Sequence, residues 1–168
     1  AGVILADTGS TVSMNGATIT GGQLNSTATG KIVANASSAN FLQGVTLNGV
    51  LDMATAQGFA RVSSGGMVLN GTISIGANSV LAPQGNQTIS GNGTIVFADG
   101  SGSNRLNVEA GNLVIDSGVT VRGEKGIIGQ QAFAGGAATL TNNGTIQADV
   151  LGGAITLAVN LSLIHISE

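Results

Sequence analysis

The chain has 168 residues, of which 28 are glycine, 8% are charged and 42% are hydrophobic, and its net charge is −3. A single proline and the lack of a glycine-every-third pattern exclude collagen, and the content of β-branched residues disfavours disorder. The chain has no basic run with interleaved aromatic residues, which argues against nucleic acid as a partner. It has no cysteine, which excludes disulfides and cysteine-based zinc sites. No run of eighteen apolar residues occurs, so we expect no membrane insertion of this segment.

The N-terminal part, up to about residue 45, alternates apolar and polar residues, as in GATITGGQLNSTATGKIVAN, without a clean repeat. A repeat is visible further along, because Asn-Gly pairs recur at Asn48, Asn70, Asn92 and Asn143, with one earlier copy at Asn15. A degenerate copy, Ser117-Gly118 in VIDSGVTVRG, fills the long gap before Asn143. The steps are then 22, 22, 25 and 26 residues, which indicates a repeat architecture.

Each copy has the same layout, with an apolar residue before the Asn-Gly and β-forming residues after it. The flanking residues are Leu47 and Leu51, Leu69 with Ile73 and Ile75, Ile89 with Ile95 and Phe97, Ile115 with Val119 and Val121, and Leu140 and Ile146. The nearest pair across each corner is four or six residues apart. Because side chains alternate between the faces of a strand, an even distance lets both residues point to the same interior.

Asn-Gly between β-like segments is also the strongest short-range signal for a β-hairpin. A hairpin meander, however, would have strands of similar length on both sides of every turn. Here two further β-like segments follow before the next copy, as GFARV and GGMVL do between Asn48 and Asn70. The pattern predicts an all-β, right-handed parallel β-helix, a solenoid of about seven coils of roughly 22–26 residues, in a single domain over residues 1–160.

The repeat makes two predictions about individual positions. Gly93 and Gly144 should lie at corners with positive φ, where glycine is favoured. Leu69, Ile89, Ile115 and Leu140 should lie in one buried column, since stacked coils place equivalent residues on one another.

The last eight residues, LSLIHISE at 161–168, resemble the translation of a transposon-based sequencing adapter. We therefore interpret 161–168 as a non-native addition that should be left out of fold reasoning. The alternative is an ordinary terminal strand, since the stretch alternates well. The only histidine, His165, falls within it.

The repeats FLQGVTLNGVLDMA, GGMVLNGTISIG, QTISGNGTIVF and GGAATLTNNGTIQADVLGG are similar to the β-helical repeats of very large bacterial surface proteins. These are autotransporter passengers and filamentous-haemagglutinin-type adhesins. The resemblance covers roughly residues 10–160 and is one of style, without a specific motif. It implies a secreted or surface-anchored rod, and it transfers no catalytic or binding residues.

Some parallel β-helix enzymes cleave polysaccharides with clustered carboxylates and basic residues. An enzyme of this kind would need several acidic residues of this chain to lie close together. The acidic residues within 1–160 are Asp7, Asp52, Asp99, Glu109, Asp116, Glu124 and Asp149. No two lie within three residues of each other, although Asp52 and Asp149 occupy similar places after a corner strand and stacking could bring such positions closer. The absence of Trp and Tyr also disfavours a sugar-cleaving groove.

Four other motifs have ordinary interpretations that we prefer. DGSGSN (99–104) is faintly like a calcium loop but lacks its distal glutamate, and VRGEKG (121–126) is expected to be a solubilising loop rather than a docking spot. Asn-x-Ser/Thr occurs at Asn25, Asn35, Asn70, Asn86, Asn92, Asn143 and Asn160, and we attribute it to corner composition rather than to glycosylation. The threonine-rich stretches TIT (18–20) and TAT (27–29) do not recur once per coil, which disfavours an ice-binding array.

We therefore expect a structural stalk or adhesive repeat segment of a large exported bacterial surface protein, secreted or at the cell surface. We expect no catalytic, cofactor-binding or metal-binding residue and no cofactor. The expected partners are neighbouring repeats of the same chain, with host or matrix glycans or proteins bound through other parts of the parent. The alternative is a polysaccharide-active β-helix enzyme. It would place carboxylates beside Arg or Lys on one lateral face, whereas the stalk would present a plain Asn/Ser/Thr face.

Overall fold

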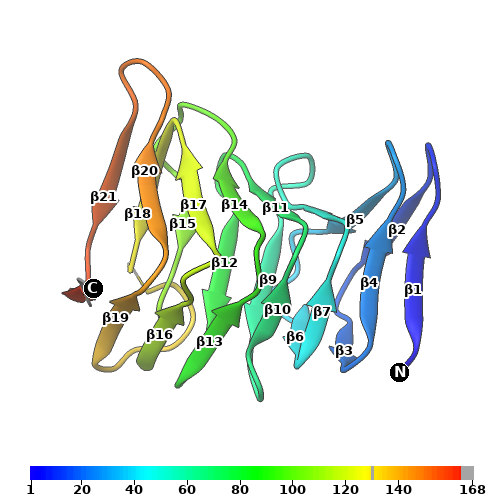
Figure 1. Ribbon diagram of the computed structural model, residues 1–168, viewed down its shortest axis with the longest axis horizontal. Coiled ribbons are helices and arrows are strands. Elements are labelled where there is room, and N and C mark those ends of the chain that lie inside the picture. Colours follow the sequence, from blue (N-terminus) through cyan, green and yellow to red (C-terminus); the bar gives the residue numbers. More distant parts are fainter. Residues whose placement is uncertain (130, 164–168) are drawn as a thin grey trace.

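The computed structural model describes residues 1–129 and 131–163, and within these residues the regular structure is entirely β. The chain visits three parallel sheets in turn, sheet A, sheet B and sheet C, and repeats this path about seven times. Figure 1 shows the coils stacked side by side from the N-terminus to the C-terminus. The predicted parallel β-solenoid is therefore confirmed. No helix long and apolar enough to span a membrane occurs in the described part of the chain.

The 22 strands within the described residues are short, mostly three to five residues. Sheet A consists of β1 (Val3–Ala6), β4 (Gln23–Ser26), β7 (Val45–Leu47), β10 (Met67–Leu69), β13 (Gln87–Ser90), β16 (Gly111–Ile115), β19 (Ala138–Asn142) and β22 (Asn160–Leu163). Sheet B consists of β2 (Thr11–Met14), β5 (Lys31–Ala34), β8 (Val50–Asp52), β11 (Thr72–Ile75), β14 (Thr94–Phe97), β17 (Thr120–Gly123) and β20 (Thr145–Ala148). Sheet C consists of β3 (Thr18–Thr20), β6 (Phe41–Gln43), β9 (Phe59–Val62), β12 (Val80–Pro83), β15 (Arg105–Leu106), β18 (Lys125–Ile128) and β21 (Ala154–Leu157).

The coils vary more in length than the Asn-Gly spacing suggests. Register partners in adjacent coils lie as few as 19 residues apart, from Ile32 to Leu51, and as many as 29 apart, from Ile127 to Thr156. The predicted length of 22–26 residues therefore holds for the middle of the stack and is too narrow for the whole chain. The turns absorb the variation, because the strands themselves stay short and paired.

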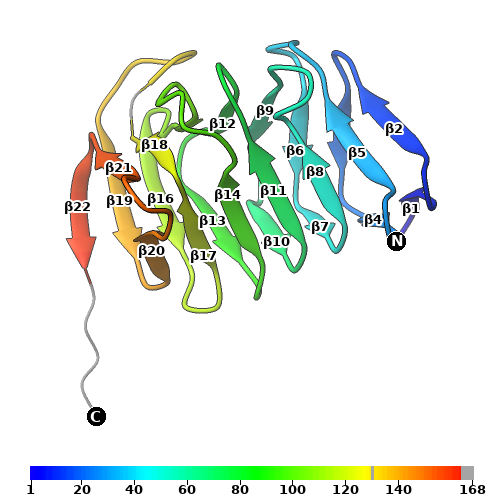
Figure 2. The ribbon, with the colours of Figure 1, turned by 90° about the horizontal axis from the view of Figure 1, so that it is seen from above.

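The repeated Asn-Gly pairs lie at one corner of the solenoid, as predicted. The pairs at Asn48, Asn70, Asn92 and Asn143, and the degenerate pair at Ser117, each connect a strand of sheet A to the next strand of sheet B. Figure 2 shows the strands of sheet B that leave this corner. The earlier pair at Asn15 differs, since it lies between β2 and β3, at the corner that joins sheet B to sheet C.

The predicted backbone conformation of the corner glycines is wrong. Gly93 and Gly144 are absent from the glycines with positive φ, whereas Gly44 and Gly66, at the corner between sheets C and A, have φ of 60° and 66°. Gly93 is required for another reason, because a Cβ atom there would lie 2.5 Å from the carbonyl oxygen of Gly71 in the previous coil. The corner selects glycine because adjacent backbones approach too closely for a side chain.

The interior is formed by the apolar residues on both sides of this corner. Leu69, Ile73 and Ile75 are fully buried, as are the equivalent residues of the neighbouring coils, and Ile146 in the last coil is half-buried. The even spacing therefore predicted the inward direction correctly. β-branched and aliphatic residues suit these strands because they pack well on a pleated surface.

The predicted single column is wrong in register. Leu69, Ile89, Ile115 and Leu140 are all buried on sheet A. Only Ile89 and Ile115 are direct partners, because Leu69 pairs with Leu47, Ile89 also pairs with Met67, and Leu140 pairs with Leu113. The physical reason is that Leu69 directly precedes Asn70, whereas Ile89 and Leu140 each stand three residues before their Asn-Gly. The four residues therefore occupy neighbouring columns on one inner face.

The proposed non-native tail is described only over residues 161–163. Leu161, Ser162 and Leu163 belong to β22, which pairs with β19. Residues 164–168, including His165, lie outside the described residues.

Candidate functional site

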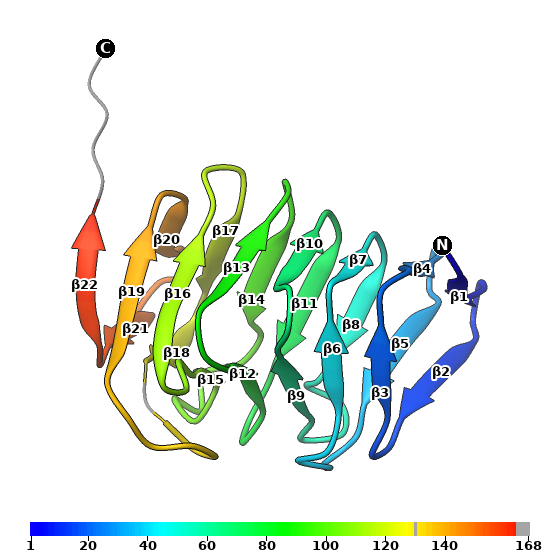
Figure 3. The ribbon, with the colours of Figure 1, turned by 90° about the horizontal axis from the view of Figure 1, so that it is seen from below.

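The outer face of sheet A is free of charge. Among the described residues, none of its eight strands contains Asp, Glu, Lys or Arg. Its outward positions hold amides and hydroxyls with a few aliphatic residues such as Val68, which is 38% exposed. Figure 3 shows this sheet along the length of the stack, with β16, β19 and β22 toward its C-terminal end. The solenoid thus presents one long neutral face.

Side-chain hydrogen bonds along this face, and along its corner with sheet B, run from coil to coil. Asn48 donates from Nδ2 to Oδ1 of Asn25 at 2.9 Å, and Asn70 donates to Oδ1 of Asn48 at 3.0 Å. Further along, Oδ1 of Asn112 accepts from the hydroxyls of Thr139 and Thr141 at 2.8 and 3.2 Å. Since the amides bond to one another, the face is ordered by its own repeats. Two Asn-x-Ser/Thr positions, Asn25 and Asn70, thus have a structural role.

Sheet B carries a threonine column on its outer face. Thr72, Thr94, Thr120 and Thr145 are successive register partners. Threonine therefore recurs in the four successive coils from β11 to β20, whereas Lys31 and Val50 hold this position in β5 and β8. The stretches TIT and TAT did not reveal this column. The neighbouring column contains Arg122, so the hydroxyls form a single row beside a charge.

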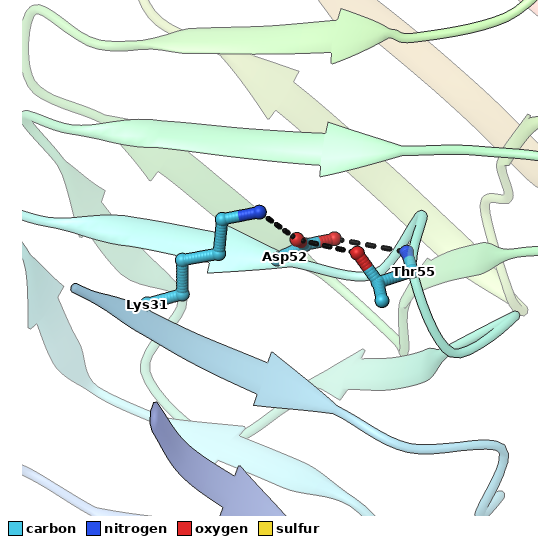
Figure 4. Close-up of polar contacts among 3 residues, drawn as sticks. All are labelled: Lys31, Asp52 and Thr55. Carbon is cyan, nitrogen blue, oxygen red and sulfur yellow. Dashed lines mark hydrogen bonds and ion pairs between the residues drawn. The ribbon is translucent and has the colours of Figure 1, made fainter. Parts of the chain in front are cut away.

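One acidic residue on sheet B is held in a partly buried ion pair. Asp52 accepts from Lys31 Nζ at 2.7 Å, from the Thr55 hydroxyl at 2.8 Å and from the Thr55 amide at 3.0 Å (Figure 4). The side chain of Asp52 is 5% exposed and that of Lys31 is 49% exposed. Burial raises the pKa of the Asp52 carboxyl, but the donors from Lys31 and Thr55 outweigh burial and keep this pKa below its usual value. The carboxylate therefore stays ionised and anchors the turn after β8.

Part of the outer face of sheet C is covered by a segment that breaks the repeat. Residues 131–136, here called the strap, follow β18 and reach back over earlier coils, as Figure 2 shows. The Glu109 carboxylate is fully buried beneath it. Glu109 Oε1 accepts from the amides of Ala132 at 2.6 Å and Phe133 at 3.1 Å, and Oε2 accepts from the amide of Ala134 at 2.6 Å. One side chain thus holds three consecutive backbone donors.

An aromatic residue of the strap packs on a strand three places away in sheet C. The Phe133 ring meets the Phe59 ring edge-to-face with centroids 5.7 Å apart. The Arg61 guanidinium lies 4.4 Å from the centroid of Phe133 and 5.2 Å from that of Phe41. This cluster contains three of the four phenylalanines of the chain, and cation–π contact adds to its apolar packing.

The residues beneath this cluster point outward yet are buried. Val80 and Ala82 flank the inward Leu81 on β12 and are 4% and 0% exposed. Phe59 and Arg105 stand beside Val80 in register, and Arg61 stands beside Ala82. The outer face of sheet C therefore forms a small second core that the alternation of the sequence did not indicate.

The structure keeps Asp52 and Asp149 apart, although they occupy similar places in the sequence repeat. Asp52 lies in β8 and Asp149 follows β20, and these strands are four places apart in sheet B. Asp149 instead accepts from Arg122 at 2.7 Å. Its pKa is lowered mainly by this hydrogen bond. Arg122, one of the two basic residues of VRGEKG, thus forms an ion pair with the residue that directly follows β20.

The calcium-like stretch closes on itself. Asp99 Oδ1 accepts from the Ser101 amide at 2.9 Å, and Asn104 Nδ2 donates to the carbonyls of Asp99 and Lys125 at 2.9 and 2.8 Å. This arrangement is that of a turn tied by its own polar groups. Within residues 1–129 and 131–163, no group of three or more potential ligands is placed to hold a metal ion.

A buried asparagine supports the corner between sheets B and C, and sequence reasoning missed it. Asn40 is 0% exposed and accepts from the amides of Gly16 and Ala17, while it donates to the carbonyls of Asn35 and Phe59. It thereby satisfies backbone groups of three coils. Its position directly before an apolar strand was the available signal, and Asn104 before β15 repeats it.

Comparison of the chain with models of known protein families, with curated proteins and with solved structures finds no match.

Proposed function

We propose that this chain is a structural stalk or adhesive repeat segment of a large exported bacterial surface protein of the adhesin or autotransporter-passenger type. It acts mechanically, as a stiff rod that projects binding regions of its parent, without catalysis. The observation that carries the proposal is a parallel solenoid with a long, charge-free Asn/Ser/Thr face on sheet A. A plain face of this kind suits a repeat that serves as a spacer.

The two ends of the stack add support. In the last coil, the inward-facing Ile146 and Ile155 are only half-buried, and Leu157 and Leu161 are 42% and 36% exposed. In the first coil, Ile4, Val12 and Ile19 are also only partly covered. A solenoid buries such residues by stacking a further coil on them, so both ends offer surfaces on which more repeats of the same kind fit.

The alternative of a polysaccharide-active enzyme has less support from the geometry. The acids that contact basic side chains are Asp52, paired with Lys31, and Asp149, paired with Arg122. The oxygens of the buried Glu109 bind strap amides instead. A catalytic acid or base needs an oxygen within reach of a substrate, which favours the stalk.

Sequencing of the genomic DNA on both sides of the coding segment tests the proposal. We expect further repeats of about 20–29 residues, an export signal upstream, and an outer-membrane or cell-wall anchor. A short reading frame with no further repeats and no export signal would contradict the stalk.

A second experiment tests the enzyme alternative. The purified chain is incubated with neutral and acidic polysaccharides, and new reducing ends and unsaturated products are measured. Time-dependent release that is absent from a heat-denatured control would establish the enzyme instead.

A further inference from the structure

We propose that the backbone amides of Ala132, Phe133 and Ala134 form a carboxylate-binding nest whose built-in ligand is Glu109, and that this clasp locks non-adjacent coils of the solenoid together. The inference is independent of the proposed stalk function. It rests on contacts of the strap with Glu109, which lies just after β15, and with Phe59 and Arg61 of β9.

The nest is defined by its donors. Three successive amides converge on the two oxygens of one carboxylate at 2.6–3.1 Å. Successive backbone N–H groups that point into one concavity bind anions, and hydrogen bonds to an ionised acceptor are stronger than neutral ones. Asn107 Nδ2 adds a longer contact to Glu109 Oε1 at 3.3 Å. The site is thus matched to a carboxylate.

The reach of the strap is unusual for a solenoid, in which each coil contacts only its neighbours. The strap follows β18, and Glu109 lies just after β15, one strand away in sheet C. Phe133 contacts Phe59 and Arg61 of β9, which is three strands away from β18. The clasp at Glu109 therefore holds the Phe133 side chain against the coil of β9. The coil of β18 does not pair with that coil in sheet C.

The first experiment measures amide hydrogen exchange of the full chain. In Glu109→Gln one acceptor oxygen is replaced by an amide donor, so we expect exchange at 132–134 and in β9 to become about tenfold faster. Phe133→Ala should accelerate exchange in β9 alone. The control is Glu124→Gln, a half-exposed acid of the next coil, which should change neither region. Unchanged exchange at 132–134 in Glu109→Gln would overturn the clasp, and faster exchange there with an unchanged β9 would overturn the lock.

The second experiment fills the nest from solution. In Glu109→Ala the side chain is removed and the three amides remain, so sodium acetate should slow exchange at 132–134 toward the wild-type rate. Sodium chloride at the same ionic strength should not. Equal effects of the two salts would overturn the carboxylate nest. If Glu109→Ala does not fold, acetate is expected to restore folding where chloride fails, and the same equality would overturn the proposal.

Discussion

The glycines at the corner between sheets A and B lie so close to the previous coil that no side chain fits. Gly144 shows this directly, because a Cβ there would overlap the carbonyl oxygen of Val119 and lie 2.6 Å from that of Asp116. Both contacts are with backbone, which can move only if the coils separate. The corner residue is therefore determined by the distance between coils.

Replacing a corner glycine should destabilise the protein through this overlap. We expect Gly93→Ala and Gly144→Ala each to lower the free energy of unfolding by about 1–3 kcal/mol, measured by urea denaturation. The control is Gly135→Ala, since a Cβ there meets no atom within 4 Å. Equal effects at all three positions would mean that coil spacing does not select the corner glycines.

The Asp52 ion pair gives a pH dependence with a defined sign. The folded pKa of Asp52 lies below its unfolded value of about 3.9, so its stabilisation is present above that value and is lost as pH falls through the folded pKa. Asp52→Asn should therefore lower the melting temperature at neutral pH, and the difference from wild type should shrink between about pH 5 and pH 2. A difference that grows on acidification would contradict the assigned ion pair.

At the scale of elements, the corner between sheets B and C at the start of the stack depends on a buried asparagine side chain. Asn40 satisfies four backbone groups, and each group left unpaired in the interior costs about 1–3 kcal/mol. We expect Asn40→Ala to lower the free energy of unfolding by several kcal/mol, measured by chemical denaturation. Asn25→Ala, in the half-exposed amide ladder, should cost about 1 kcal/mol or less. A smaller loss at Asn40 than at Asn25 would show that the corner does not need its buried asparagine.

The elements differ in how far the sequence predicts them. The even spacing of four residues between Leu69 and Ile73 correctly predicted that both side chains point into the interior. This was possible because the alternation of side chains along a strand is a local property. The register between Leu69 and Ile89 could not follow from Asn-Gly positions, because pairing depends on the backbone path through three corners. The strap could not be predicted from the sequence either, because the contact of Glu109 with residues 132–134 joins chain segments that no periodic pattern relates. Burial of Val80 and Ala82 was missed for the same reason.

At the scale of the molecule, stability accumulates from interfaces between neighbouring coils. A mid-stack residue such as Ile73 is fully buried between two coils, whereas Ile146 in the last coil is covered on one side only. We expect Ile73→Ala to cost about 2–5 kcal/mol of unfolding free energy and Ile146→Ala distinctly less, measured by chemical denaturation. Equal costs would mean that the end of the stack is covered as well as its middle.

The central claim, a parallel stack of coils in sequence order, can be measured as a series of distances along sheet B. The chain has no cysteine, so nitroxide labels can be attached to cysteines introduced at Thr11 in β2 and at Thr94, Thr120 or Thr145 in β14, β17 or β20. These pairs are four, five and six strands apart in the sheet. Double electron–electron resonance should give backbone separations of about 19, 24 and 29 Å, rising by about 4.8 Å per coil. Distances that stay level or fall along the series, as a folded-back hairpin meander would give, would contradict the solenoid.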